Sequence, residues 1–217
     1  IVQAIVGIRQ YRVTYSGVAN HAGATPMHLR HDSLAAAAQA IAAVEELAAA
    51  SPSGVTVGTV GMLVNEPNAA NVIPGRTTFS IDVRDTDAAA IDETAARVLE
   101  RAQRIGEERG VDMQVTTTAD SAPVVLSQRL RDALVRSAKA QKTDYLEMPS
   151  GAAHDAQEIA RVTDAAMLFV PSVGGRSHCP EEDTPHEAIA QGVDVLLGAV
   201  RQALGEAEAT PSKEGVE

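Results

Sequence analysis

The chain has 217 residues, of which 45% are hydrophobic, and its formal net charge is −11. A chain of this length can bury one large or two small cores, and no apolar run in it is long enough for a membrane span. The acidic balance and an aromatic content of 2% argue against nucleic acid as a partner. The single cysteine, Cys179, excludes an internal disulfide and agrees with a reducing, cytoplasmic compartment.

The chain starts with isoleucine and enters an apolar strand at once, so we expect it to be a piece of a longer protein. The strand pattern ends near Ser16, and a loop rich in glycine and alanine follows with His21 in it. Small residues leave the backbone uncovered, so a ligand or a second protein surface could approach His21. The alternative is a turn with a solvated or capping histidine.

The first half of the chain predicts the element order β-α-β-β-α-β. This order is that of the ferredoxin-like arrangement, an antiparallel sheet with two helices on one face and the other face open. After the opening strand, the predicted elements are a helix over 33–50 with Leu34, Ile41, Val44 and Ala48 on one face, strands over 55–63 and 75–84, a helix over 87–109 with Ile91, Ala95, Val98, Ala102 and Ile105 buried, and a strand from Val111 to Val115.

The second half alternates helix and strand, which indicates a largely parallel sheet with too few strands to close its own core. The missing strands are expected from sequence that this chain does not contain. The predicted elements are a helix from Ser127, a strand over 145–148, a helix over 154–160, an apolar strand over 165–170, and a helix capped by Thr184, Pro185 and Glu187 with Ile189, Val193, Leu196 and Val200 as its core stripe.

Two loops in this half, over residues 149–156 and 172–182, follow predicted strand ends, where ligands of open α/β sheets collect. His178 lies in the second loop beside several acidic residues and could bind a divalent cation. It could equally be a hydrogen-bonded loop histidine, because no HxxxH or CxxC pair supplies further ligands nearby. Cys179 next to it is either a nucleophile or, since neighbours on an extended loop point apart, a passive small side chain.

Two polar residues in the first half are further candidates. Asn71 lies in a turn-rich connection, where asparagine usually serves turn geometry. Arg84 emerges on the polar face at the end of a predicted strand, where it could bind a carboxylate through two parallel hydrogen bonds or simply be solvated.

Five motifs in this order resemble the amidase branch of the M20 metallopeptidases, which contains N-carbamoyl-L-amino-acid hydrolases, allantoate amidohydrolases and β-ureidopropionases. The similarity extends from about residue 5 to about residue 204. The motifs are Asn-His-Ala-Gly-Ala-Thr-Pro-Met at 20–27 with Arg30 and Asp32, Asn-Ala-Ala-Asn-Val-Ile-Pro-Gly at 68–75, Asp-Val-Arg-Asp at 82–85, Ser-Gly-Ala-Ala-His-Asp-Ala at 150–156, and Gly-Gly-Arg-Ser-His at 174–178 with Glu181 and Glu182.

The resemblance implies a two-domain α+β enzyme. Residues 8–118 match a ferredoxin-like lid that dimerises, residues 1–7 and 119–205 match the C-terminal part of an α/β metallohydrolase catalytic domain, and residues 206–217 form a tail that we expect to be disordered. The complete active site would hold two divalent metal ions, of zinc, manganese, cobalt or nickel.

The resemblance also implies a role for each candidate residue. His178 matches the last metal ligand, and His21 matches the lid histidine that reaches the partner subunit's active site and stabilises the oxyanion of the tetrahedral intermediate. Asn71 and Arg84 match the positions that hold the substrate carboxylate, and Gly151 matches a backbone position that contacts the substrate.

The remaining metal ligands and the general base of the family lie upstream of the lid, outside this sequence. We therefore expect the complete enzyme to cleave a linear C–N bond of an N-carbamoyl-L-amino acid or an allantoate-like ureido acid, and the present chain alone to be inactive. Ala153 and Cys179 depart from the family's usual glycine and serine. The alternatives are a non-catalytic dimerisation and ligand-binding module, or an aminoacylase-like or peptidase-like member of the same family.

Overall fold

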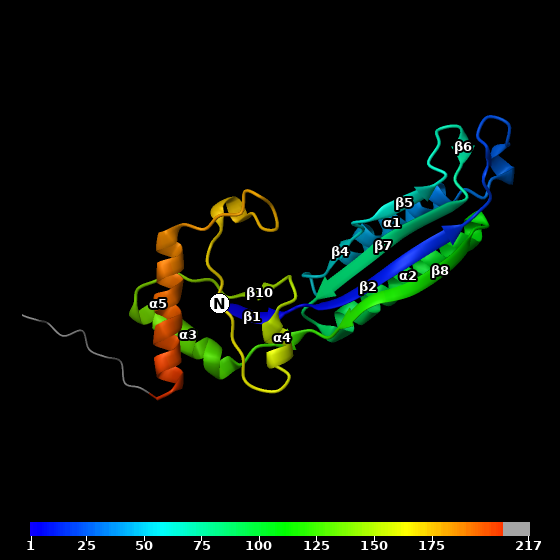
Figure 1. The fold of residues 1–217 in the computed structure, drawn as a ribbon. Coiled ribbons are helices and arrows are strands. Elements are labelled where there is room, and N and C mark those ends of the chain that lie inside the picture. The colour runs from blue at the N-terminus through cyan, green and yellow to red at the C-terminus, as the bar shows by residue number, and fades with distance from the viewer. Residues whose placement is uncertain (206–217) are drawn as a thin grey trace, which may run out of the picture. The chain divides into compact units, whose positions relative to one another are not determined.

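The computed structural model describes residues 1–205, which fold as two compact units of mixed α+β structure (Figure 1). One unit runs from Val6 to Pro123, and the other combines Ile1–Ile5 with the chain from Val124 onward. The α+β fold class predicted from the sequence is confirmed. The tail predicted at 206–217 lies outside the described residues.

The unit from Val6 to Pro123 is an antiparallel sheet with two helices packed on one of its faces (Figure 1). The strand order is β4-β7-β2-β8, and β5 also pairs with β7. The elements are β2 (Gly7–Ser16), α1 (Ser33–Ala49), β4 (Val57–Thr59), β5 (Leu63–Glu66), β7 (Arg76–Asp85), α2 (Ala88–Arg109) and β8 (Asp112–Ser121), with two short strands, β3 (Asn20–His21) and β6 (Val72–Ile73), outside the main sheet.

The core of this unit follows from the alternation of β2 and β7, which pair residue for residue from Gly7 with Asp85 to Ser16 with Arg76. Tyr15 and Phe79 are fully buried on the helix side, with ring centroids 5.7 Å apart. The Tyr15 hydroxyl donates a 2.6 Å hydrogen bond to the Ala102 carbonyl of α2, so the large aromatic ring brings no unpaired polar atom into the core.

Both predicted helices are present, but the buried face of α1 differs from the prediction. The Asp32 carboxylate caps α1 by accepting from the backbone N–H groups of Leu34 and Ala35. Leu34 and Ile41 are only half-buried, because the face against the sheet consists mainly of alanines. These small side chains allow close approach: a Cβ on Gly58 of β4 would lie 2.8 Å from the Ala48 Cβ.

The apolar stripe of α2 is buried as predicted, at Ile91, Ala95, Val98, Ala102 and Ile105. The helix ends at Gly110, whose φ of 64° lies in the left-handed region that favours glycine.

The second unit contains a three-stranded sheet in the order β10-β1-β9, with β1 parallel to β10 and antiparallel to β9. The prediction of a strand over 165–170 was wrong. This segment takes part only in isolated backbone hydrogen bonds, from Val2 N–H to the Met167 carbonyl and from Ser127 N–H to the Ala165 carbonyl. The elements are β1 (Val2–Ile5), β9 (Val124–Val125), α3 (Gln128–Ala140), β10 (Met148–Ser150), α4 (Asp155–Ile159), η2 (Val173–Gly175) and α5 (His186–Ala203).

The core stripe predicted for the last helix was also wrong. Leu196 is 50% exposed in α5, and the other three predicted core residues, Ile189, Val193 and Val200, are 43% to 57% exposed. The helix instead packs on α3 through Val195 and Ala199, where the Ser137 hydroxyl of α3 donates to the Val195 carbonyl at 2.7 Å. The predicted Thr184 cap is absent, since the helix begins after Pro185 without a side-chain cap bond. No helix within residues 1–205 meets the length and hydropathy needed to cross a bilayer.

A buried carboxylate lies in the chain between β7 and α2. Asp85, at the end of β7, is fully buried and accepts hydrogen bonds from the Ser53 hydroxyl at 2.6 Å, the Thr56 hydroxyl, and the Asp87 N–H at 2.8 Å. Burial acts to raise the pKa of Asp85, but these hydrogen bonds outweigh it, and the pKa lies below its usual value. The ionised carboxylate thus ties the 51–56 turn to the sheet.

Replacing this carboxylate, in Asp85→Asn, is expected to lower the free energy of unfolding by about 2 kcal/mol at neutral pH, because donors aimed at a charged oxygen lose their partner. Since folding lowers the pKa of Asp85, its stabilisation is present above about pH 4 and is lost as the pH falls through the lower folded-state value. Urea titrations across this range should therefore show a flatter acid dependence for the variant. The exposed Asp112→Asn serves as control, and equal stability of the two variants at neutral pH would contradict this account.

Candidate functional site

His21 and Asn71 are brought together at one end of the sheet in the Val6–Pro123 unit. His21 ends β3, which pairs with β6 so that His21 lies opposite Val72, the neighbour of Asn71. The Ala22 N–H donates to the Asn71 carbonyl at 2.9 Å, and the Gly17 N–H donates to the Gly75 carbonyl at 2.8 Å. Both His21 and Asn71 are exposed, so either side chain can meet a ligand or a second protein surface.

The protonation pattern of the His21 ring follows from its hydrogen bonds. Its Nδ1 accepts from the backbone N–H groups of Gly23 at 3.0 Å and of Ala24 at 3.2 Å. A backbone N–H can only donate, so Nδ1 carries no proton in this arrangement and the neutral ring carries it on Nε2. The loop therefore presents His21 as a hydrogen-bond donor through Nε2–H, a role suited to an oxyanion.

Arg84 lies at the other end of the same sheet. It pairs with Ile8 and Val57, and the strand from Arg76 to Arg84 spans roughly 26 Å at about 3.3 Å per residue. Its guanidinium is half-buried and makes two hydrogen bonds to Asp82, from Nε at 2.8 Å and from Nη2 at 3.0 Å. The bond to Asp82 raises the pKa of Arg84 further, so this side chain is a permanent cation.

Gly151 follows β10 in the second unit and is exposed. A Cβ built on it would meet no heavy atom within 4 Å, so the space beside its Cα is open. A pair that was not predicted from the sequence lies in this loop: the buried Ser150 hydroxyl hydrogen-bonds to Nε2 of His154 at 2.7 Å. The His154 ring also lies 5.6 Å from the Phe169 ring. A serine and a histidine four residues apart across a tight turn was the available signal.

His178 also belongs to the second unit, in an exposed loop after η2. Its φ of 57° is uncommon for a residue other than glycine, and such strained backbone is often found at functional sites. Its N–H donates to Glu182 Oε2 at 2.7 Å, which fixes an acidic side chain in the same loop.

No metal site is complete in the part of the chain that the structure describes. Among residues 1–205, no group of three or more His, Cys, Asp or Glu side chains could hold a metal ion. A zinc site needs three or four protein ligands, so His178 by itself does not fit a bound metal. The adjacent Cys179 is a half-buried free cysteine.

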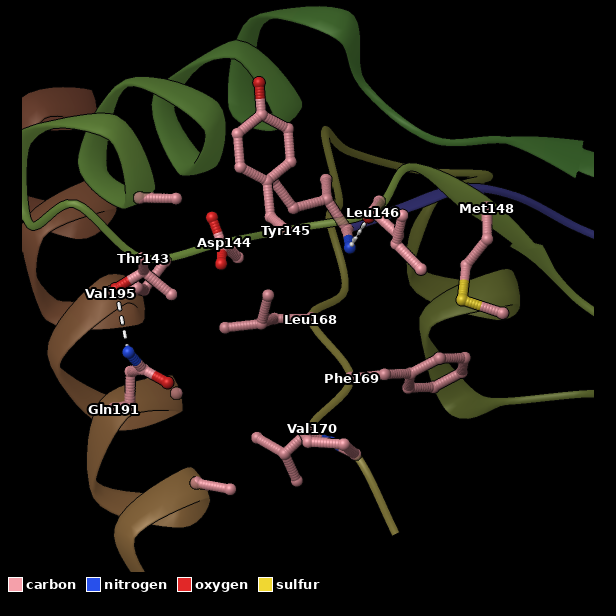
Figure 2. Close-up of a pocket in the computed structure, with 15 residues that line it drawn as sticks. Thr143, Asp144, Tyr145, Leu146, Met148, Leu168, Phe169, Val170, Gln191 and Val195 are labelled. Carbon is pink, nitrogen blue, oxygen red and sulfur yellow. Dashed lines mark hydrogen bonds between the residues drawn. The ribbon is translucent and has the colours of Figure 1, made fainter. Parts of the chain in front are cut away.

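A separate hollow of about 360 Å³ lies within the second unit, and Figure 2 shows the side chains around it. Its walls are mostly apolar, and Gln191 Nε2 donates to Thr143 Oγ1 at 3.2 Å at one side. None of the predicted site residues lines it. The lining residues labelled in Figure 2 are Thr143, Asp144, Tyr145, Leu146, Met148, Leu168, Phe169, Val170, Gln191 and Val195.

Comparison with known proteins identifies the family. Residues 10–202 match the model of peptidase family M20/M25/M40. The chain is 42% identical over 202 residues to an N-carbamoyl-L-amino acid amidohydrolase of Geobacillus stearothermophilus, covering 93% of this chain and 49% of that protein. It is 37% identical over 196 residues to the allantoate amidohydrolase of Escherichia coli (strain K12), covering 90% and 47%.

A solved structure gives the same result: an amidase of the hydantoinase/carbamoylase family from Burkholderia multivorans superposes with a TM-score of 0.86 at 34% identity, covering 91% of this chain and 48% of that one. The chain therefore belongs to the M20 peptidase family, and the resemblance found in its motifs to the amidohydrolases of that family is confirmed. It spans about half the length of the curated relatives that it matches.

The openness of the Gly151 loop can be tested by its tolerance to a side chain. Gly151→Ala is expected to change the free energy of unfolding by less than about 0.5 kcal/mol, because the added Cβ meets nothing within 4 Å. Gly17→Ala is the matched comparison and should lose stability by more than about 2 kcal/mol, since its Cβ would lie 2.0 Å from the His31 carbonyl oxygen. Thermal and urea unfolding measure both, and a Gly151→Ala loss as large as that of Gly17→Ala would contradict an open loop.

Proposed function

We propose that this chain is part of a metal-dependent amidohydrolase that cleaves a linear C–N bond of an N-carbamoyl-L-amino acid or of an allantoate-like ureido acid. The observation that carries the proposal is the similarity of nearly the whole chain to amidohydrolases that bear these two names. The Nε2–H donor of His21 and the permanent cation of Arg84 supply two kinds of group that hydrolysis of a ureido acid needs, one for an oxyanion and one for a carboxylate.

In this proposal the unit from Val6 to Pro123 is a ferredoxin-like lid through which two copies dimerise. Its strand order, with two helices on one face and a polar, uncovered second face, supports that assignment. The unit that begins again at Val124 is then the C-terminal part of the catalytic domain.

The separation of Asn71 and Arg84 supports a proposed site that is built from two subunits. Asn71 and Arg84 of one chain lie at opposite ends of β7, farther apart than the length of a small ureido acid. They can contact one substrate molecule only if they come from different copies of the chain. We therefore assign Arg84 to one subunit of each site, and His21 together with Asn71 to the partner.

Each residue has a defined task in this site. Arg84 binds the substrate carboxylate, and Asp82 holds the guanidinium in place through its two hydrogen bonds. Asn71 adds an amide to the same carboxylate, and the backbone at Gly151, which has open space beside its Cα, contacts the substrate. His21 donates from Nε2 to the oxygen that becomes negatively charged when the carbonyl carbon turns tetrahedral.

His178 supplies one ligand to the metal ions of the complete enzyme in this proposal. In this proposal the remaining ligands and the general base come from outside residues 1–205, and the absence among these residues of any group of three or more metal-binding side chains supports this for the ligands. The present chain alone is therefore expected to lack activity.

The apolar surface of the second unit supports the same conclusion. One face of α5 exposes Ile189, Val193, Leu196 and Val200, and an apolar hollow lies beside Val195. Exposed apolar surface of this kind usually marks an interaction face. We propose that the remainder of the catalytic domain covers it in the complete protein.

Hydrolysis assays test the proposal directly. The complete protein, supplied with Mn²⁺ or Zn²⁺, is expected to release product from N-carbamoyl-L-amino acids or from allantoate, and a chelator is expected to abolish the activity. The 217-residue chain should show no turnover under the same conditions. Turnover by this chain alone would refute the proposed missing ligands, and a metal-loaded complete protein that cleaves peptides but no ureido acid would favour the peptidase alternative.

A further inference from the structure

The His21 loop is held by an arginine that no role described above uses. Arg30 donates from Nη2 to the Ala22 carbonyl at 2.6 Å and from Nε to the Thr25 carbonyl at 3.0 Å. These two carbonyls lie on either side of Gly23 and Ala24, the residues whose N–H groups donate to His21 Nδ1. One side chain therefore fixes both ends of the segment that orients the histidine ring.

Beyond the β3–β6 pairing and the Ala22 N–H bond to the Asn71 carbonyl, the loop has few other restraints. Gly23 and Ala24 are exposed, and Gly23 carries no side chain to pack. The turn is closed by Thr25, which donates to the His21 carbonyl from its N–H at 3.2 Å and from its hydroxyl at 2.9 Å. Without further support, such a loop samples many backbone conformations, and N–H groups that rotate away from Nδ1 no longer hold the ring.

Arg30 itself lies at the end of a short helical turn, two residues before the N-cap of α1. Its backbone N–H donates to the Met27 carbonyl, and the next residue, His31, accepts from the Val18 N–H at 2.9 Å through its carbonyl. Asp32 then caps α1. The guanidinium thus links the segment that leads into α1 to the His21 loop. Its planar group binds two carbonyls at once, which a lysine ammonium on a flexible side chain does less well.

We propose that Arg30 is a positioning residue for His21. By holding the Ala22 and Thr25 carbonyls it keeps the Gly23 and Ala24 N–H groups aimed at Nδ1, and the imidazole is held as an outward Nε2–H donor before any ligand arrives. The action of this Nε2–H on an oxyanion rests on the function proposed above, whereas the restraint that Arg30 places on the loop does not.

The restraint can be measured by NMR on the ¹⁵N-labelled 217-residue chain. In the wild type, the Gly23 and Ala24 amides are expected to have order parameters near 0.85, and the neutral His21 ring should carry its proton on Nε2. In Arg30→Ala both order parameters are expected to fall below about 0.6, while the amides of α1 remain unchanged. Arg30→Lys should restore little of the order, because it cannot bind both carbonyls in the same geometry.

Arg12→Ala is the matched control, since Arg12 is an exposed arginine of β2 in the same unit and should leave both amides rigid. Unchanged Gly23 and Ala24 order in Arg30→Ala, or a wild-type ring protonated on Nδ1, would overturn the proposal. Full rescue by Arg30→Lys would also contradict it, because charge alone would then suffice.

The complete, metal-loaded protein separates this proposal from the proposed function. If both hold, Arg30→Ala lowers kcat by roughly 10- to 100-fold with little change in KM, since misplacement of a transition-state donor affects the chemical step. If Arg30→Ala loses amide order but His21→Gln keeps its kcat, the positioning role stands and the catalytic role of His21 is refuted. If Arg30→Ala keeps its amide order but His21→Gln loses much of its kcat, the catalytic role of His21 stands and the positioning role of Arg30 is refuted.

Discussion

The residue-for-residue pairing of β2 with β7 is the constraint on which the candidate site depends. Ten pairs run without interruption from Gly7 with Asp85 to Ser16 with Arg76, and the buried rings of Tyr15 and Phe79 fix their register against the helices. Because both strands are extended over this length, Arg84 at one end and His21 at the other are separated within one chain. The proposed site therefore takes these two residues from two copies of the chain.

The end that carries His21 is held by hydrogen bonds in which backbone N–H and carbonyl groups of the loop take part, together with the Arg30 guanidinium. Gly23 and Ala24 donate to the ring, and the Asn71 carbonyl accepts from Ala22. Small residues are needed there because their backbone must face the imidazole and leave its other nitrogen uncovered. The Arg84 end differs: Asp82 holds the guanidinium in a half-buried position, so the charge that the proposed carboxylate ligand needs is already oriented.

The sequence predicted those parts of the fold whose periodicity reflects contacts inside the chain. The stripe of α2 and the alternation of β7 were readable because both faces that they bury belong to the same unit. The stripe of α5 led to a wrong prediction for the opposite reason. Leu196 and the other three residues of that stripe have the apolar pattern of a core but remain exposed within residues 1–205. The hydrogen bonds of Arg30 could not be predicted from spacing, since bonds to backbone carbonyls leave no periodic signal. The Ser150–His154 pair left only its four-residue separation, which no helix or strand period singles out.

The central claim, a site shared between two subunits, is tested most directly by mixing two inactive variants of the complete protein. Arg84→Ala and His21→Gln, expressed together, form hybrid dimers in which one site has both wild-type residues and the other has neither. If the residues act across the interface, the mixture should recover about a quarter of the wild-type activity, because half of the randomly formed dimers are hybrids with one intact site. A mixture no more active than the two separate variants would place both residues in a site formed by a single chain and contradict the account.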